Sequence, residues 1–160
     1  MDQIRASSVL AIERLVDPFE AKESLRHQVL QLEDRMRQEP DQIHIEPVHY
    51  FAQGLYAREI TIPKGAALTG KIHLFEHINI ISKGDISVLT EDGVKRIKAP
   101  ATIISQPGIK RIGYAHEETV WTTIHACNVK DGDEAESLLV VDTFEEFEKM
   151  LKAKECPSLP

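Results

Sequence analysis

The sequence predicts a mainly β fold of the sandwich or barrel class. Short runs rich in Ile, Val and Thr recur between residues 43 and 126, at the length of strands. Gly and Pro turn signals separate these runs, and Asp92-Gly93 is a strong hairpin signal. Helical patterns occur only before and after this region, so strands do not alternate with helices as they would in a parallel α/β sheet.

Residues 1–41 are predicted to form a helical N-terminal extension. Ser7 or Ser8 is a candidate cap for a first short helix, and Asp17-Pro18 has the residues of a second helix start. The second helix carries an apolar stripe at spacings of four, three and four, formed by Leu25, Val29, Leu32 and Met36. This stripe either covers the outside of the β domain or pairs with a second copy of the chain.

Residues 42–128 are predicted to form the β domain, and Pro47 suggests that its first strand lies at an edge. The expected strands are 55–62, 72–75, 77–82, 86–89, 94–97, 102–105, 110–115 and 119–126.

Residues 129–160 are predicted to form the C-terminal region. A polar loop over 128–137 leads into it, and a last strand over 138–141 and a C-terminal helix follow. Thr143 and Glu146 form a capping box, which opens the helix that continues through Ala153. The tail beyond it is expected to fray.

Composition excludes some classes of function. The chain has 160 residues and a formal net charge of −7, which argues against general nucleic-acid binding and against binding to anionic membranes. Its two cysteines, Cys127 and Cys156, form no disulfide framework. Without an apolar leader or a membrane-spanning stretch, we expect a cytoplasmic protein.

The chemistry centres on His73 and His77, which are four residues apart with Glu76 between them. On a helix this pattern, His-x-x-Glu-His, would match an inverted zinc-peptidase motif. The β-branched residues that follow favour strands instead. On strands, where alternate residues share a face, His77 lies with Asn79, and His125 lies with Trp121 and Thr123.

The stretches 65–84 and 105–111 resemble the two sequence motifs of the cupins. The first cupin motif runs from Gly through His-x-His and Glu to a second Gly; here Lys71 stands at the first His, His73 at the second and His77 at the Glu. In the second motif, after Pro107-Gly108, Arg111 stands at the His, and Ala115 stands at the Asn. The resemblance implies a jelly-roll β-barrel with a pocket at its mouth.

The resemblance leaves three interpretations of that pocket open. In the first, His73, His77 and His125 hold a divalent metal such as Zn, Fe, Ni or Cu. In the second, no metal binds, and Lys71, Arg111 and Asn79 bind a small anion. In the third, the histidines only satisfy hydrogen bonds.

The class of function is likewise open between an enzyme and a binding module. The partner of such a module would be a small anionic ligand or a protein. The chain is also similar to small cupin-like proteins of tailed phages, which implies an accessory role. Because cupins commonly dimerise, the resemblance implies a homodimer.

Overall fold

The computed structural model of the chain describes residues 3–4, 22–90 and 92–154, with side chains over 25–90 and 92–153. The predicted helix starts at Ser7, Ser8 and Asp17-Pro18, and Cys156, lie outside the described residues.

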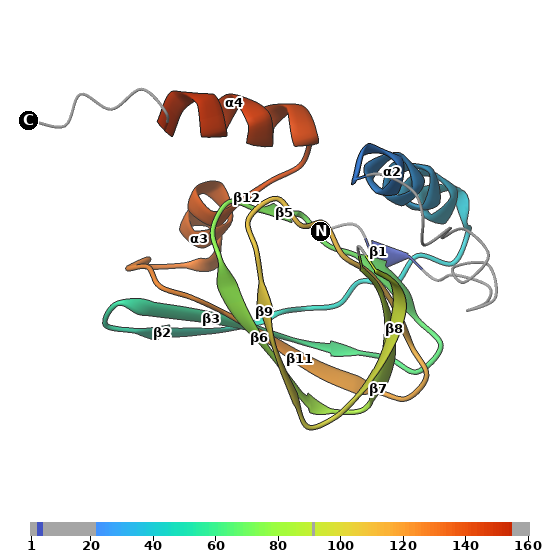
Figure 1. The fold of residues 1–160 in the computed structure, drawn as a ribbon. Helices are drawn as coiled ribbons and strands as arrows, with labels where there is room; N and C mark the ends of the chain where they lie inside the picture. The colour runs from blue at the N-terminus through green and yellow to red at the C-terminus, as the bar shows by residue number, and fades with distance from the viewer. Residues whose placement is uncertain (1–2, 5–21, 91, 155–160) are drawn as a thin grey trace, which may run out of the picture.

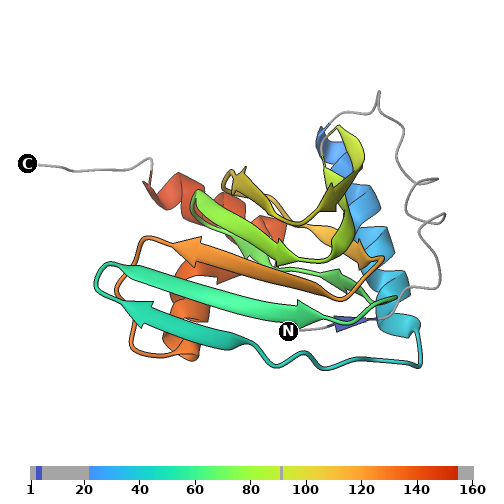
Figure 2. The ribbon, with the colours of Figure 1, turned by 90° about the horizontal axis from the view of Figure 1, so that it is seen from below.

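Two five-stranded antiparallel sheets face each other, as Figures 1 and 2 show, which confirms the predicted mainly β fold. In spatial order, the first sheet contains β1 (Gln3–Ile4), β4 (Ala67–Thr69), β10 (Ile112–Ala115), β7 (Asp85–Thr90) and β8 (Gly93–Lys98). The second contains β2 (Val48–Ala52), β3 (Leu55–Ile62), β11 (Thr119–His125), β6 (His77–Lys83) and β9 (Ala101–Ser105). The short strands β5 (Ile72–His73) and β12 (Val140–Val141) pair separately.

Apolar side chains from both sheets fill the space between them. Ile60 and Ile62 of β3 pack with Ile86 and Val88 of β7, and Trp121 of β11 packs against this cluster. The alternation of buried and exposed residues along β6 follows the period of two that places one face of a strand in a core. The interior of the barrel is therefore apolar at this depth.

Helix α2 (Lys22–Gln38) covers the outer face of the first sheet. Its buried residues Val29, Leu32 and Met36 pack against Leu89 and Ile112 of that sheet. Of the two interpretations of the apolar stripe, covering the β domain is thus confirmed, and the stripe is already occupied within one chain.

Helix α3 (Gly132–Leu139) occupies most of the region that was predicted to be a polar loop, so that prediction was wrong. Asp131 caps it by accepting a hydrogen bond from the backbone N–H of Glu134, at 2.8 Å. The Glu134 carboxylate in turn accepts one from the backbone N–H of Lys130. The Asp131 cap favours a helix start despite the polar sequence, because it satisfies a backbone donor that a helix start leaves unpaired.

The chain after α3 returns to the barrel mouth. The predicted last strand is only two residues long, because 138–139 still belong to α3, and β12 pairs with β5. Helix α4 (Phe144–Lys154) follows the predicted capping box at Thr143 and Glu146. None of the described helices is long and apolar enough to cross a membrane.

Candidate metal and ligand site

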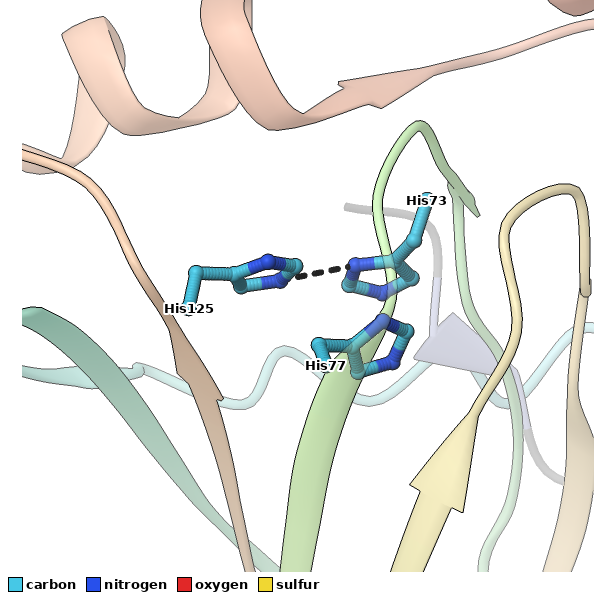
Figure 3. A group of neighbouring side chains, drawn as sticks. All are labelled: His73, His77 and His125. Atoms are coloured by element: carbon cyan, nitrogen blue, oxygen red, sulfur yellow. Dashed lines mark hydrogen bonds between the residues drawn. The ribbon is translucent and has the colours of Figure 1, made fainter.

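Three imidazole rings from three strands converge at the mouth of the barrel, where Figure 3 shows them facing one another. His73 comes from β5, His77 from the start of β6 and His125 from the end of β11. The ring centroid of His77 lies 4.1 Å from that of His73 and 4.8 Å from that of His125. Nδ1 of His73 lies 3.0 Å from Nε2 of His125. One potential ligand nitrogen from each residue lies within 4.8 Å of the others.

Backbone pairing fixes the position of His73. Strand β5 is bonded to β12, where His73 is opposite Val140. The carbonyl of His73 accepts a hydrogen bond from the backbone N–H of Gly108, at 2.8 Å. The His-x-x-Glu-His segment is therefore two strands joined by a turn, and Glu76 accepts a hydrogen bond from Gln106 at the surface. The peptidase interpretation, which needs a helix, is wrong.

A backbone carbonyl fixes the tautomer of neutral His77. Nδ1 of His77 lies 2.9 Å from the carbonyl oxygen of Phe75. Because a carbonyl only accepts, Nδ1 must carry the proton, and the lone pair then lies on Nε2. Within the described part of the chain, Nδ1 of His125 is buried and has no hydrogen-bond partner.

The surroundings keep the three imidazoles neutral. Burial lowers the pKa of His73 well below its ordinary value. Repulsion from a proton on His77 or His125, and the positive charges of Arg58 and Arg111, lower it further. Burial and the neighbouring His77 lower the pKa of His125 to about 4. Burial also lowers the pKa of His77, although its bond to Phe75 opposes the shift. Neutral imidazole is the form that ligates a metal.

The inner face of the second sheet is layered in depth. Tyr56 and His125 are register partners at the mouth. Two residues deeper lies a polar row in which Arg58, Thr123 and Asn79 are opposite one another. The next row is apolar and contains Ile60, Trp121 and Ile81.

Asn79 organises the polar row. Its amide oxygen accepts hydrogen bonds from the Trp121 indole and from the Thr123 hydroxyl, both at 2.9 Å. Its amide nitrogen donates to the Ser105 hydroxyl at 2.8 Å. Arg111 donates to the same hydroxyl through Nε and Nη2, at 3.2 and 2.8 Å. Asn79 is therefore positioned by three neighbours and in turn holds the site together.

Lys71 forms ion pairs with two acidic residues of the C-terminal segment. Its ammonium group is paired with Glu136 of α3 and lies 3.0 Å from Asp142. Neither acid was singled out from the sequence, and Glu136 lies in the stretch 128–137 that was predicted to be a loop. The one available signal was the capping pattern at Asp131 and Glu134, which predicts the helix that carries Glu136.

Two cavities meet at these residues. The inner cavity, about 90 Å³, lies inside the barrel and brings the predicted ligand residues Lys71, Asn79 and Arg111 together with His73 and His77. The outer cavity, about 280 Å³, lies beside α3 and is lined by His125. Five residues line both cavities: Arg58, Gly70, Lys71, His73 and Thr123. His73 therefore stands at the boundary between the interior of the barrel and a vestibule.

No family model matches the sequence, and neither does any curated protein. Cupin-domain proteins are among the solved structures similar to this chain, in agreement with the sequence resemblance. A cupin-2 domain protein from Shewanella frigidimarina is 12% identical, with 64% of this chain and 99% of that chain covered and a TM-score of 0.44. An RmlC-like cupin from the same organism is 17% identical, with coverages of 54% and 86% and a TM-score of 0.43. An acetylacetone dioxygenase from Acinetobacter johnsonii is 14% identical, with coverages of 68% and 76% and a TM-score of 0.43.

Proposed function

We propose that His73, His77 and His125 bind one divalent transition metal, and that the barrel admits a small ligand beside it. The observation that carries this proposal is the convergence of three neutral imidazoles at the mouth of the inner cavity.

The spacing of the donors fits a metal. Zinc binds imidazole nitrogen at roughly 2.0–2.1 Å, so tetrahedral ligands lie about 3.3 Å apart. The ligand nitrogens here lie within 4.8 Å of one another, and one pair is 3.0 Å apart. Small side-chain rotations would bring all three into range. The hydrogen bond between His77 and Phe75 supports the site further, because metal-binding histidines usually donate their other N–H to such an acceptor.

The chemistry of the donors selects the class of metal. Three imidazoles suit Zn, Fe, Ni or Cu, whereas Mg and Ca prefer oxygen ligands. A metal held by three residues keeps open positions, where it supplies a Lewis acid or an activated water. The role of the chain is then to orient the imidazoles through β5, β6 and β11 and to surround the open side with the inner cavity.

A second candidate function is metal-free binding of an anion, as a non-catalytic module. It is favoured by the presence of Lys71 and Arg111 in the lining of the inner cavity, with Asn79 beside them. In that case the imidazoles act as neutral hydrogen-bonding groups.

The predicted homodimer, phage accessory role and cytoplasmic location stay predictions. For the dimer, the outer face of the second sheet is a candidate surface, because its register partners Ile78 and Ile104 are 43% and 63% exposed. Light scattering at micromolar concentration would test it, and a monomer would contradict it.

Metal titration tests the main proposal. Untagged protein is stripped with a chelator and titrated with Zn²⁺ by calorimetry. We expect one equivalent to bind, and His77→Ala to weaken binding by at least roughly a hundred-fold, because lost second-shell groups alone cost 10–100-fold. His44→Ala is the matched control, because His44 is an exposed histidine paired with Glu46. Equal binding by all three proteins would contradict the proposal.

A further inference from the structure

Two of the three candidate metal ligands lie on strands that are paired on both sides. His77 lies on β6, which pairs with β11 and β9, and His125 lies on β11, which pairs with β3 and β6. Such a strand cannot shift without breaking two ladders of backbone hydrogen bonds. The second five-stranded sheet therefore fixes the positions of these two imidazoles.

The third ligand, His73, is held in another way. Its strand, β5, belongs to neither five-stranded sheet, and β12 is the only described strand that pairs with it. Figure 1 shows β5 and β12 side by side at the mouth, next to α3 and α4. The backbone N–H of Leu74 donates to the carbonyl of Leu139, at 2.8 Å. Residues 132–154, called the C-terminal clamp below, thus supply the strand partner of β5.

Ion pairs attach the C-terminal clamp to the chain just before β5. Lys71 is two positions from His73, and its ammonium group pairs with Glu136 of α3 and lies 3.0 Å from Asp142. Both pairs are partly solvated, so each of them is weak by itself. Burial of apolar side chains is therefore the stronger attachment.

Phe147 of α4 supplies this apolar attachment. It is 5% exposed and belongs to one apolar cluster with Ile72 and Leu74, the two sequence neighbours of His73. Its ring also lies against the backbone of Gly108, because a Cβ atom built on this glycine would be 2.6 Å from Cε1 of the ring. The N–H of Gly108 donates to the carbonyl of His73, at 2.8 Å. Phe147 therefore packs on β5 and on the loop that is hydrogen-bonded to it.

We propose that the C-terminal clamp positions His73 against the other two imidazoles, and that Phe147 is its main positioning residue. When the clamp is undocked, β5 loses its described strand partner, and the sheet holds only His77 and His125 in place. Docking of the clamp and metal binding by all three histidines are then coupled, and the coupling is reciprocal. The coupling rests on the proposed function, since it concerns the assembly of the same site.

The first test needs no metal and follows the imidazole ring protons of stripped protein by NMR. We expect Phe147→Ala to remove the nuclear Overhauser contact between His73 and His125, whose ring centroids are 5.1 Å apart. The contact between His77 and His125, at 4.8 Å, should remain, because β6 and β11 are neighbours in the sheet. Retention of both contacts overturns the inference.

A more conservative variant guards against misfolding in this test. Phe147→Leu keeps an apolar side chain but shortens its reach toward Gly108. If Phe147→Ala loses both contacts, Phe147→Leu decides: a weakened contact of His73 with His125 beside an unchanged contact of His77 with His125 supports the inference, and two unchanged contacts overturn it.

The second test measures zinc affinity by calorimetry. We expect Phe147→Ala to weaken zinc binding by roughly ten-fold or more, as the loss of a group that orients a ligand does, and Phe147→Leu by less. Ile86→Ala is the matched control, because it truncates a side chain that is 1% exposed but lies among the apolar residues between the sheets, and it should bind zinc as the wild type does. Zinc should in turn slow amide exchange at Leu74 in the wild type.

The outcomes separate the clamp from the metal proposal. Equal zinc affinity in Phe147→Ala and Ile86→Ala overturns the inference, while zinc binding by the wild type still supports the proposed function. A wild type that binds no zinc overturns the proposed function. In that case, loss of the contact between His73 and His125 in Phe147→Ala still supports the positioning role of the clamp, and its retention overturns that role.

Discussion

The two ends of the barrel interior differ sharply in chemistry although the same strands form both. The ends of β3, β6 and β11 that lie at the mouth carry Tyr56, His77 and His125. At the deep end, β3 carries Ile62, which is fully buried and packs with Ile86 and Val88. A buried polar group that lacks a partner is costly, whereas buried apolar groups stabilise the fold. We therefore assign the function to the polar end and most of the stability to the apolar end.

The deep end should dominate stability. Ile86 is 1% exposed, and truncating a buried isoleucine to alanine costs about 2–5 kcal/mol in unfolding free energy. We expect Ile86→Ala to show this loss in urea denaturation and to retain one equivalent of zinc when folded. Leu138→Ala, at a 50% exposed position on α3, is the matched control and should change stability by less than about 0.5 kcal/mol. Similar losses in both variants would contradict the assigned role of the deep end.

The mouth should make the metal-free protein sensitive to acid. The pKa of His125 is about 4 in the folded chain and 6.5 as its ordinary value. Between these values the unfolded state binds the additional proton, so this contribution to stability is complete above pH 6.5 and falls as the pH drops toward 4. The loss amounts to roughly 3 kcal/mol at one pKa unit per 1.36 kcal/mol.

Denaturation of stripped protein between pH 7 and 4 measures this slope. His125→Gln should make this slope shallower but not remove it, because His73 and His77 are also kept neutral by burial. An unchanged slope in His125→Gln would show that His125 is not held neutral at the mouth.

The contact of helix α3 with the barrel mouth should contribute least to the free energy of unfolding. The ion pair between Lys71 and Glu136 is partly solvated, with the side chains 26% and 53% exposed, so solvent screens it. We expect Glu136→Gln to cost less than about 1 kcal/mol globally but to speed amide exchange at Leu74, which donates to the Leu139 carbonyl. Glu145→Gln removes an exposed pair with Lys149 and should not affect Leu74. Unaltered amide exchange at Leu74 in Glu136→Gln would mean that the ion pair does not hold α3 against the barrel mouth.

Periodicity predicted much of the polar end. The period of two along a strand placed His77 with Asn79 on one face of β6 and His125 with Thr123 on one face of β11, and the structure shows that both faces point inward. The cupin resemblance added the convergence of β5 with these strands. Period-two reasoning works here because one face of each strand is buried, so a shift by one residue would bury the wrong side chains.

Long-range partners could not be predicted in the same way. Lys71 contacts Glu136 and Asp142, which are 65 and 71 positions away in the sequence; Glu136 lies on helix α3, which was predicted to be a loop, and Asp142 follows β12. Its polar composition concealed the helix, whose start depends on local caps rather than on an apolar stripe. The period of two puts Arg58 on one face with Tyr56 and Ile60, and only the register with Thr123 brings that face to the site.

X-ray absorption at the zinc edge of the loaded protein tests the central claim most directly. We expect a first shell with three imidazole nitrogens at about 2.0–2.1 Å, accompanied by the outer-shell scattering of the rings. His73→Ala should lose one of the three nitrogens, and His44→Ala should keep all of them. A first shell of oxygens alone, or a spectrum that His73→Ala leaves unchanged, would show that the three imidazoles at the barrel mouth do not form a metal site.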